Sequence, residues 1–215
     1  MHEHHIQELQ ESIEATGRGV IKVRPDLALV RLGVVVTAKK PETAIAENAE
    51  RMSAVINAIR KLGVPESAIQ TVGFNVQPIY EWDEENKKSV LSGYRATNGV
   101  SVRASIEQAG EIYDTGVNAG ANEAGGITFT LKDDSKARRD ALIQATKLAM
   151  DEIQIVATAL GVGLRGPLHA EVLENGVDRP IELGFRAGDV GTTPVLPGQV
   201  EVAQSVRLVF GLKDQ

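Results

Sequence analysis

The chain of 215 residues is 42% hydrophobic, 24% charged and 4% aromatic, which is typical of a soluble globular protein with an aliphatic core. Its net charge of −6 and its scattered basic residues argue against nucleic-acid binding, which requires a positive patch. The absence of cysteine excludes disulfides, thiolate catalysis and cysteine-ligated metal sites. No apolar run reaches about 18 residues, so we expect no transmembrane segment.

The first half of the chain predicts two strands, a helix and a long hairpin. Apolar and polar residues alternate where strands are expected, and apolar residues recur every three or four positions in the helix. Pro41 is placed to open that helix, and Gly63 with Pro65 is placed to end it. In chain order we predict a mobile tail at 1–11, strands at 13–23 and 27–37, a helix from Pro41 to Leu62, and strands at 69–82 and 89–104 joined by an acidic turn at 83–86.

The second half predicts the same kinds of element. Ser105 and Gln108 fit a capping box at the start of a short helix. Asp134 or Ser135 is placed to cap a long helix that reaches Leu160. In chain order we predict a short helix from 106, a glycine-rich loop at 118–126, a strand at 127–131, the long helix, and strands at 168–173 and 199–212.

The order of these elements repeats along the chain. A strand, a helix ending in Leu-Gly-Val and two further strands occur once from Leu27 and once from Ile127. We interpret this pattern as two β-α-β-β units produced by internal duplication, which pack together. The predicted fold class is α+β, with a mixed β-sheet and helices packed on one side. The predicted boundaries are a tail at 1–11, a first unit with an extra N-terminal strand at 12–104, a connecting short helix and loop at 105–126, and a second unit at 127–215.

A long insert at 175–198 interrupts the second predicted unit. It is rich in glycine and proline, yet too apolar for a free linker. We therefore expect it to pack on a neighbouring copy of the chain. The predicted oligomer contacts are Ile181, Leu183, Phe185, Val190, Val195 and Leu196.

Motifs of enzyme chemistry are weak in this sequence. Residues 161–166 match G-x-G-x-x-G, but a helix precedes them and a strand follows, the reverse of a dinucleotide site. We read these glycines as the end of a helix. His2, His4 and His5 lie in the tail, and His169 stands alone in a predicted strand. We therefore expect no catalytic residue, no bound metal and no cofactor.

Asn98 lies on the apolar face of a predicted strand, and Gln204 does the same in the last strand. Three interpretations stay open for Asn98. It fixes strand register by hydrogen bonding, as Gln204 would; a bulge at Gly99 turns it outward; or it binds a ligand. The apolar neighbours that define the face of Asn98 are Ala96, Val100, Val102 and Ala104.

Several short stretches resemble the SIMPL-domain family, the YggE-like proteins, in order and spacing from about Ile13 to Leu212. The stretches are 16–19, 25–28, 77–80, 93–98 and 197–202. The resemblance implies a largely uncharacterised protein. It also implies export to the periplasm or envelope, a link to oxidative stress in some members, and large ring- or channel-like homo-oligomers in others. It supplies no established catalytic residue.

We therefore predict a non-enzymatic protein that forms homo-oligomers and has a cell-envelope or oxidative-stress role. The alternative is a module that binds a small molecule or peptide in a cleft between the units, using Tyr80, Trp82, Tyr94 and Arg95. The N-terminal residues have no apolar segment typical of a signal peptide. We thus expect a cytoplasmic location for the chain as given, or a periplasmic one if a leader was removed.

Overall fold

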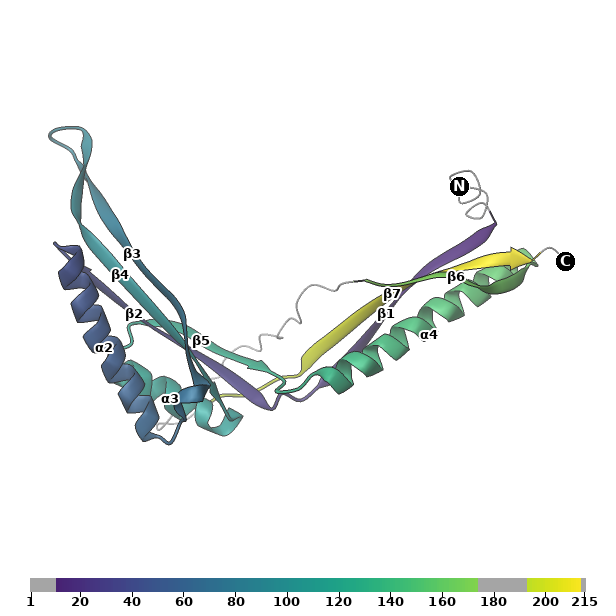
Figure 1. Cartoon of the computed structure of the whole chain (residues 1–215), viewed down its shortest axis with the longest axis horizontal. Coiled ribbons are helices and arrows are strands. Elements are labelled where there is room, and N and C mark those ends of the chain that lie inside the picture. The colour runs from purple at the N-terminus through teal and green to yellow at the C-terminus, as the bar shows by residue number, and fades with distance from the viewer. Residues whose placement is uncertain (1–10, 174–192, 214–215) are drawn as a thin grey trace. The chain divides into compact units, whose positions relative to one another are not determined.

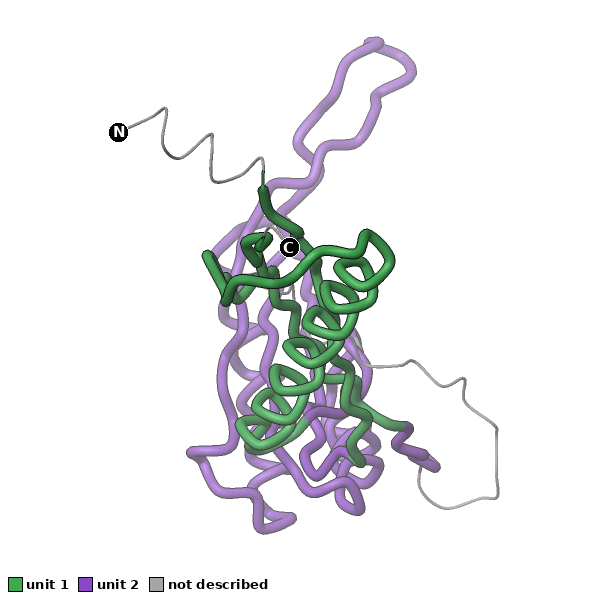
Figure 2. The backbone as a smooth tube through the Cα atoms, turned by 90° about the vertical axis from the view of Figure 1, so that its right-hand side faces the viewer, with its two compact units in different colours: residues 1–24, 131–181, 199–215 green, residues 25–130, 182–198 purple. Residues whose placement is uncertain are grey.

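The computed structural model describes residues 11–173 and 193–213 (Figure 1). The chain divides into two compact units, coloured separately in Figure 2. Unit 1 takes residues 1–24, 131–181 and 199–215, and unit 2 takes residues 25–130 and 182–198. One face of an antiparallel sheet is covered by two helices in unit 2 and by one helix in unit 1.

Unit 2 contains a four-stranded sheet in the order β3-β4-β2-β5, in which all the described pairs are antiparallel. The strands are β2 (Leu27–Ala38), β3 (Ile69–Asp83), β4 (Lys88–Ala104) and β5 (Glu123–Thr130). The helices are α2 (Pro41–Lys61), the 3-10 turn η1 (Glu66–Ala68) and α3 (Ile106–Asn118). The Oγ of Ser105 accepts a hydrogen bond from the N–H of Gln108 at 3.4 Å, so the predicted cap of α3 is confirmed.

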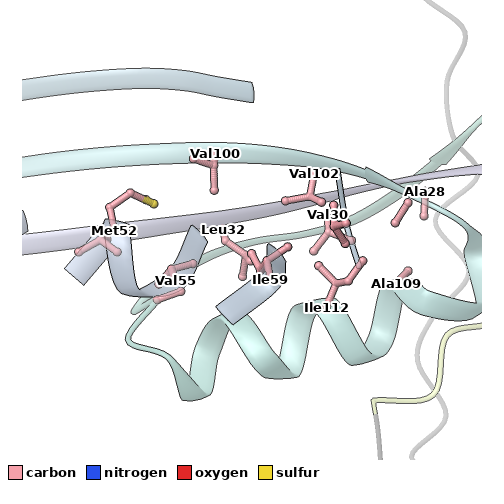
Figure 3. Packing of buried hydrophobic residues seen from close by; sticks show 14 of the residues in the cluster. Ala28, Val30, Leu32, Met52, Val55, Ile59, Val100, Val102, Ala109 and Ile112 are labelled. Atoms are coloured by element: carbon pink, nitrogen blue, oxygen red, sulfur yellow. The ribbon is translucent and has the colours of Figure 1, made fainter. Parts of the chain in front are cut away.

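The core of unit 2 lies between β2, β4 and the two helices (Figure 3). Alternate strand residues point to the same face, and each large side chain buried there contributes about 1.5–3 kcal/mol. Among the described residues, β3 adds only the partly buried Ile69 to this cluster. The largest fully buried members are Val30, Leu32, Val34, Val55, Ile59, Val100, Val102 and Ile112.

Unit 1 contains a three-stranded antiparallel sheet in the order β1-β7-β6, with α4 against one face. Its elements are β1 (Ser12–Val23), α4 (Ser135–Leu160), β6 (Gly163–Leu173) and β7 (Val200–Lys213). Gly161 ends α4 in the left-handed conformation, with φ of 70°. Helix termination at the G-x-G-x-x-G stretch is therefore confirmed, although β6 begins five residues earlier than the predicted Leu168.

A stripe of alanines lets α4 approach β1 unusually closely. Ala141, Ala145 and Ala149 are fully buried and lie four residues apart, on one side of the helix. A Cβ atom at Gly17 would meet the carbonyl oxygen of Ala145 and lie 2.7 Å from the nitrogen of Ala149. A Cβ at Gly19 would meet the carbonyl oxygen of Ala141. The backbones of helix and strand therefore touch, and only glycine fits in β1 at these positions.

Strand pairing differs from the predicted arrangement. β5, predicted to open the second repeat, pairs with β2, and β1, predicted to belong to the first repeat, pairs with β7. The α+β class is confirmed, but the described strands form two antiparallel sheets instead of one mixed sheet. The units of the structure therefore cross the predicted boundaries, because alternation shows which face of a strand is buried but not its neighbours. The internal duplication stays a prediction.

A buried asparagine joins α2 to the sheet. Asn48 is completely buried, and its Nδ2 donates to the carbonyl oxygens of Val34 at 2.7 Å and Ala96 at 3.1 Å. One amide thus spans the two neighbouring strands β2 and β4. Its Oδ1 is buried with no hydrogen-bond partner among the described residues. Since a buried amide is costly unless it is paired, these two bonds fix the position of α2 on the sheet.

Replacing Gly17 with alanine should destabilise the protein strongly, because the added methyl group collides with backbone atoms that cannot move aside. We expect Gly17→Ala to lose about 3 kcal/mol or more of unfolding free energy in urea, followed by circular dichroism. Gly73→Ala is the matched control, since a Cβ there meets nothing within 4 Å. Equal midpoints for the two variants would contradict the close approach of α4 and β1.

Replacing Asn48 with aspartate should also destabilise the protein, because a carboxylate cannot donate to the carbonyls of Val34 and Ala96. We expect Asn48→Asp to lose about 3 kcal/mol in the same urea experiment. Asn57→Asp, on an exposed position of the same helix, should change stability by less than about 1 kcal/mol. A loss of similar size at both positions would show that Asn48 has no special role.

Candidate functional site

Asn98 lies on the side of β4 that faces the helices. It stands opposite Val34 of β2 and Phe74 of β3. The register between β2 and β4 is continuous through Asn98 and Gly99, and the nearby irregularity lies in β3, between Thr71 and Gly73. Thus β4 does not turn Asn98 outward. The residue is half-buried, and its Oδ1 is enclosed without a hydrogen-bond partner among the described residues. Its register-fixing and ligand-binding roles stay predictions.

Gln204 lies on the face of β7 that is turned toward α4, opposite Gly19 of β1. Its Nε2 donates to the carbonyl oxygen of the adjacent Ala203 at 2.8 Å. This bond stays within one strand, so it does not tie β7 to a neighbouring strand. Asn98 and Gln204 therefore occupy similar positions in the two sheets, but their surroundings differ.

The four residues predicted to form a ligand site do not converge. Tyr94 pairs with Ala38, the last residue of β2, and beyond it β3 and β4 continue as a two-stranded ribbon. Tyr80 and Trp82 lie on this ribbon and are 61% and 57% exposed. Arg95 follows Tyr94 directly and so points to the opposite face of the sheet. The aromatic residues and Arg95 therefore cannot line one pocket within this sheet.

The tip of the ribbon is held by a carboxylate. Asp83 Oδ1 accepts the backbone N–H groups of Glu85 and Asn86, each at 3.0 Å, and Oδ2 accepts the Asn86 side chain at 2.8 Å. These bonds favour the ionised form, so the pKa of Asp83 lies below its usual value, chiefly because of the Asn86 side chain. The pKa of Asp133 is lowered in the same way by the backbone N–H of Ser135 before α4. Both carboxylates hold turns, and neither geometry indicates catalysis.

α4 presents apolar side chains on its exposed side as well as on its buried side. Leu148, Ile155 and Val156 are 44%, 67% and 42% exposed and lie seven and eight residues apart. At about 100° per residue these three lie within about 100° of the helix circumference, and Leu160, 63% exposed, lies one turn after Val156. We call these four residues the α4 stripe.

The end of the long insert docks on α3. Thr193 donates its N–H and its hydroxyl to the two carboxylate oxygens of Asp114, at 2.7 and 2.6 Å. Gly110 allows the close approach, because a Cβ there would meet the carbonyl oxygen of Thr193. No local sequence pattern predicts this contact, since Asp114 and Thr193 are 79 residues apart.

The predicted oligomer contacts are placed only in part. Val195 is half-buried and lies near Gly110 of the same chain, so it packs within unit 2. Leu196 is 73% exposed and stays available to another molecule. The other four residues of that prediction, Ile181, Leu183, Phe185 and Val190, lie outside the described residues.

Other kinds of site find no support in residues 11–173 and 193–213. No group of three His, Cys, Asp or Glu side chains in these ranges is arranged to hold a metal ion. None of the helices described there combines the length and the hydrophobicity needed to cross a membrane. His169 lies on β6 opposite Val209.

Comparison with known proteins supplies the family. Residues 13–210 match the model of the SIMPL family, described as a protein of unknown function (DUF541). The chain is 31% identical to a 26 kDa periplasmic immunogenic protein of Brucella melitensis, over 94% of this chain and 84% of that protein. It is 26% identical to the uncharacterized protein YggE of Escherichia coli K12, over 65% of this chain and 58% of YggE. The chain therefore belongs to the SIMPL family.

Proposed function

We propose that this chain is a non-enzymatic protein of the cell envelope that works as an assembly of identical copies. The observation that carries the proposal is the α4 stripe. The four large apolar side chains of the stripe lie within about 140° of the helix circumference, and each is between 42% and 67% exposed, which is unfavourable in water. A neighbouring copy that covered these side chains would gain about 25 cal/mol of free energy per Å² of apolar surface buried.

The build of unit 1 supports the same proposal. One helix covers a sheet of three strands, and β6 is exposed along most of its length. Leu168 and Val172 of β6 are 40% and 58% exposed, so apolar groups are uncovered on the sheet as well as on α4. Extended exposed apolar surfaces on soluble proteins mark contact sites more often than isolated exposed residues do. Packing against another copy would give unit 1 a further layer.

The envelope location rests on the relatives. The Brucella proteins that align over 94% of this chain are named as periplasmic. The absence of cysteine suits such an oxidising compartment, where free thiols are readily modified. The link to oxidative stress stays a prediction that rests on the family resemblance.

The native mass tests the proposal. Size-exclusion chromatography with light scattering should give a mass several times that of the 23.0 kDa chain. Ile155→Lys should lower that mass at least two-fold, because a lysine ammonium cannot be buried in an apolar contact without a partner. Gln154→Lys, which adds the same charge at a neighbouring exposed position on a different side of the helix, should keep the mass of the unmodified protein. A mass of 23.0 kDa for the unmodified chain would overturn the proposal.

A further inference from the structure

The outer edge of β3 is the longest exposed strand edge in unit 2. β3 lies at the end of the sheet and, among the described strands, pairs only with β4. Eleven of its 15 residues are exposed, and Phe74, Tyr80 and Trp82 each expose more than half of their surface. A long edge of this kind offers hydrogen-bonding groups to another strand.

The direction of the backbone groups follows from the neighbouring strands. The side-chain amide of Asn122 bonds both the N–H and the C=O of Val35, at 2.7 and 2.8 Å, on the β5 side of β2. In an antiparallel ladder the backbone groups of successive residues point to opposite sides, so Val34 and Val36 point toward β4. The pairing of β2 with β4 is continuous here, and so is the pairing of β4 with β3. The same alternation therefore directs the backbone groups of Asn75 and Gln77 in β3 toward β4.

Phe74, Val76 and Pro78 must then direct their backbone groups to the free edge. Pro78 has no N–H, and a proline is tolerated within a strand where the missing donor faces away from the sheet. Its presence agrees with the alternation. The register to β4 is continuous from Gly73 to Ile79, so Phe74 and Val76 offer regular outward N–H and C=O groups.

Some of the other described strand edges carry a cap or an irregularity. The N–H of Val20 in β1 donates to the Oε1 of Gln144 on α4 at 2.9 Å. Asn122 occupies the edge of β2 where β5 has ended. β6 carries Pro167 and two register shifts, so its register to β7 is continuous only from His169 to Leu173. From Gly73 to Ile79, β3 has no such bond or shift among the described residues, so this stretch offers a regular edge.

The charges at the two ends of β3 select the orientation of a partner. The acidic end is the hairpin tip, where four carboxylates outnumber two lysines: Glu81, Asp83, Glu84 and Glu85 against Lys87 and Lys88. The basic end lies around η1, where Arg103 donates to the carbonyl oxygen of Ser67 at 2.8 Å and Arg60 pairs with Glu66 at 3.4 Å. Lys61 adds a further positive charge there. Two copies of β3 placed antiparallel bring each acidic end beside a basic end, whereas a parallel pair opposes like charges.

We propose that the outer edge of β3 pairs antiparallel with β3 of a second copy, joining two four-stranded sheets into one. The pair is isologous, so the same backbone groups of Phe74 and Val76 serve both copies. Phe74 lies on the helix-facing side of the sheet, where it would pack across the junction. This inference rests on the proposed self-association, and it identifies one of the interfaces between copies.

A proline at Val76 tests the backbone part of the contact. Val76→Pro removes an outward N–H and leaves the inward bonds to β4, so it should lower the native mass at least two-fold at equal concentration. Val76→Ala is the control, because it shortens the side chain but keeps the N–H, and it should keep the mass of the unmodified protein. Circular dichroism of each variant verifies folding. A folded Val76→Pro protein with unchanged mass overturns the β3 contact, while a monomeric unmodified chain overturns the proposed function itself.

Cross-linking tests the orientation without relying on the proline variant. The chain has no cysteine, so Gln70→Cys and Glu81→Cys each introduce a single thiol, at exposed positions near opposite ends of β3. The two variants, carrying different tags, are co-expressed and treated with a short bifunctional maleimide. Antiparallel pairing should yield the mixed product at least five-fold over either homodimer product. Predominance of the homodimer products would overturn the antiparallel contact. If no cross-link forms, a second copy does not pair with the β3 edge, and the proposal is overturned. An extended peptide would then be the candidate partner for this edge.

Discussion

The helices of each unit cover only part of its sheet, and this incomplete cover decides which apolar side chains and strand edges stay exposed. α2 and α3 bury one face of β2 and β4, and α4 buries one face of β1 and β7. The edge strands β3 and β6 lie outside this cover, and most of their residues are exposed. A chain with so few helices leaves apolar side chains and strand edges in water, where both favour contact with another molecule.

Close packing where helix and sheet do meet compensates in part for this incomplete cover. In unit 1 the glycines at 17 and 19 and the alanine stripe bring two backbones together, so a single helix fixes a long strand. The same small residues turn the bulkier residues of α4 toward its flanks and its outer side. The exposed α4 stripe is thus a consequence of the alanine stripe, because a helix that buries alanine must place its larger apolar residues elsewhere. In unit 2 the amide of Asn48 performs the corresponding task for α2.

The sequence was sufficient for the elements and for the faces of many strands. The helix from Pro41, the hairpin turn at 83–86, the cap at Ser105 and the end of α4 at Gly161 follow from local signals, and the structure confirms them. Alternation also placed Asn98 on the helix-facing side of β4. The sequence did not predict which strands pair, because β1 pairs with β7 and β5 pairs with β2 through residues far apart in the chain.

The candidate surfaces also depend on contacts that the local sequence does not predict. The exposed ribbon of β3 and β4 could be located from the sequence, but the separation of Tyr94 and Arg95 onto opposite faces removes the predicted cluster. The anchor between Asp114 and Thr193 joins residues with no shared motif. The local sequence of α4 also does not show that alanines would face the sheet in most turns of the helix.

Sedimentation velocity of the unmodified protein over a dilution series tests self-association most directly. The exposed α4 stripe and the free edge of β3 predict a dominant species several times heavier than 23.0 kDa, with smaller species appearing on dilution. A single species of 23.0 kDa at every concentration would contradict this account.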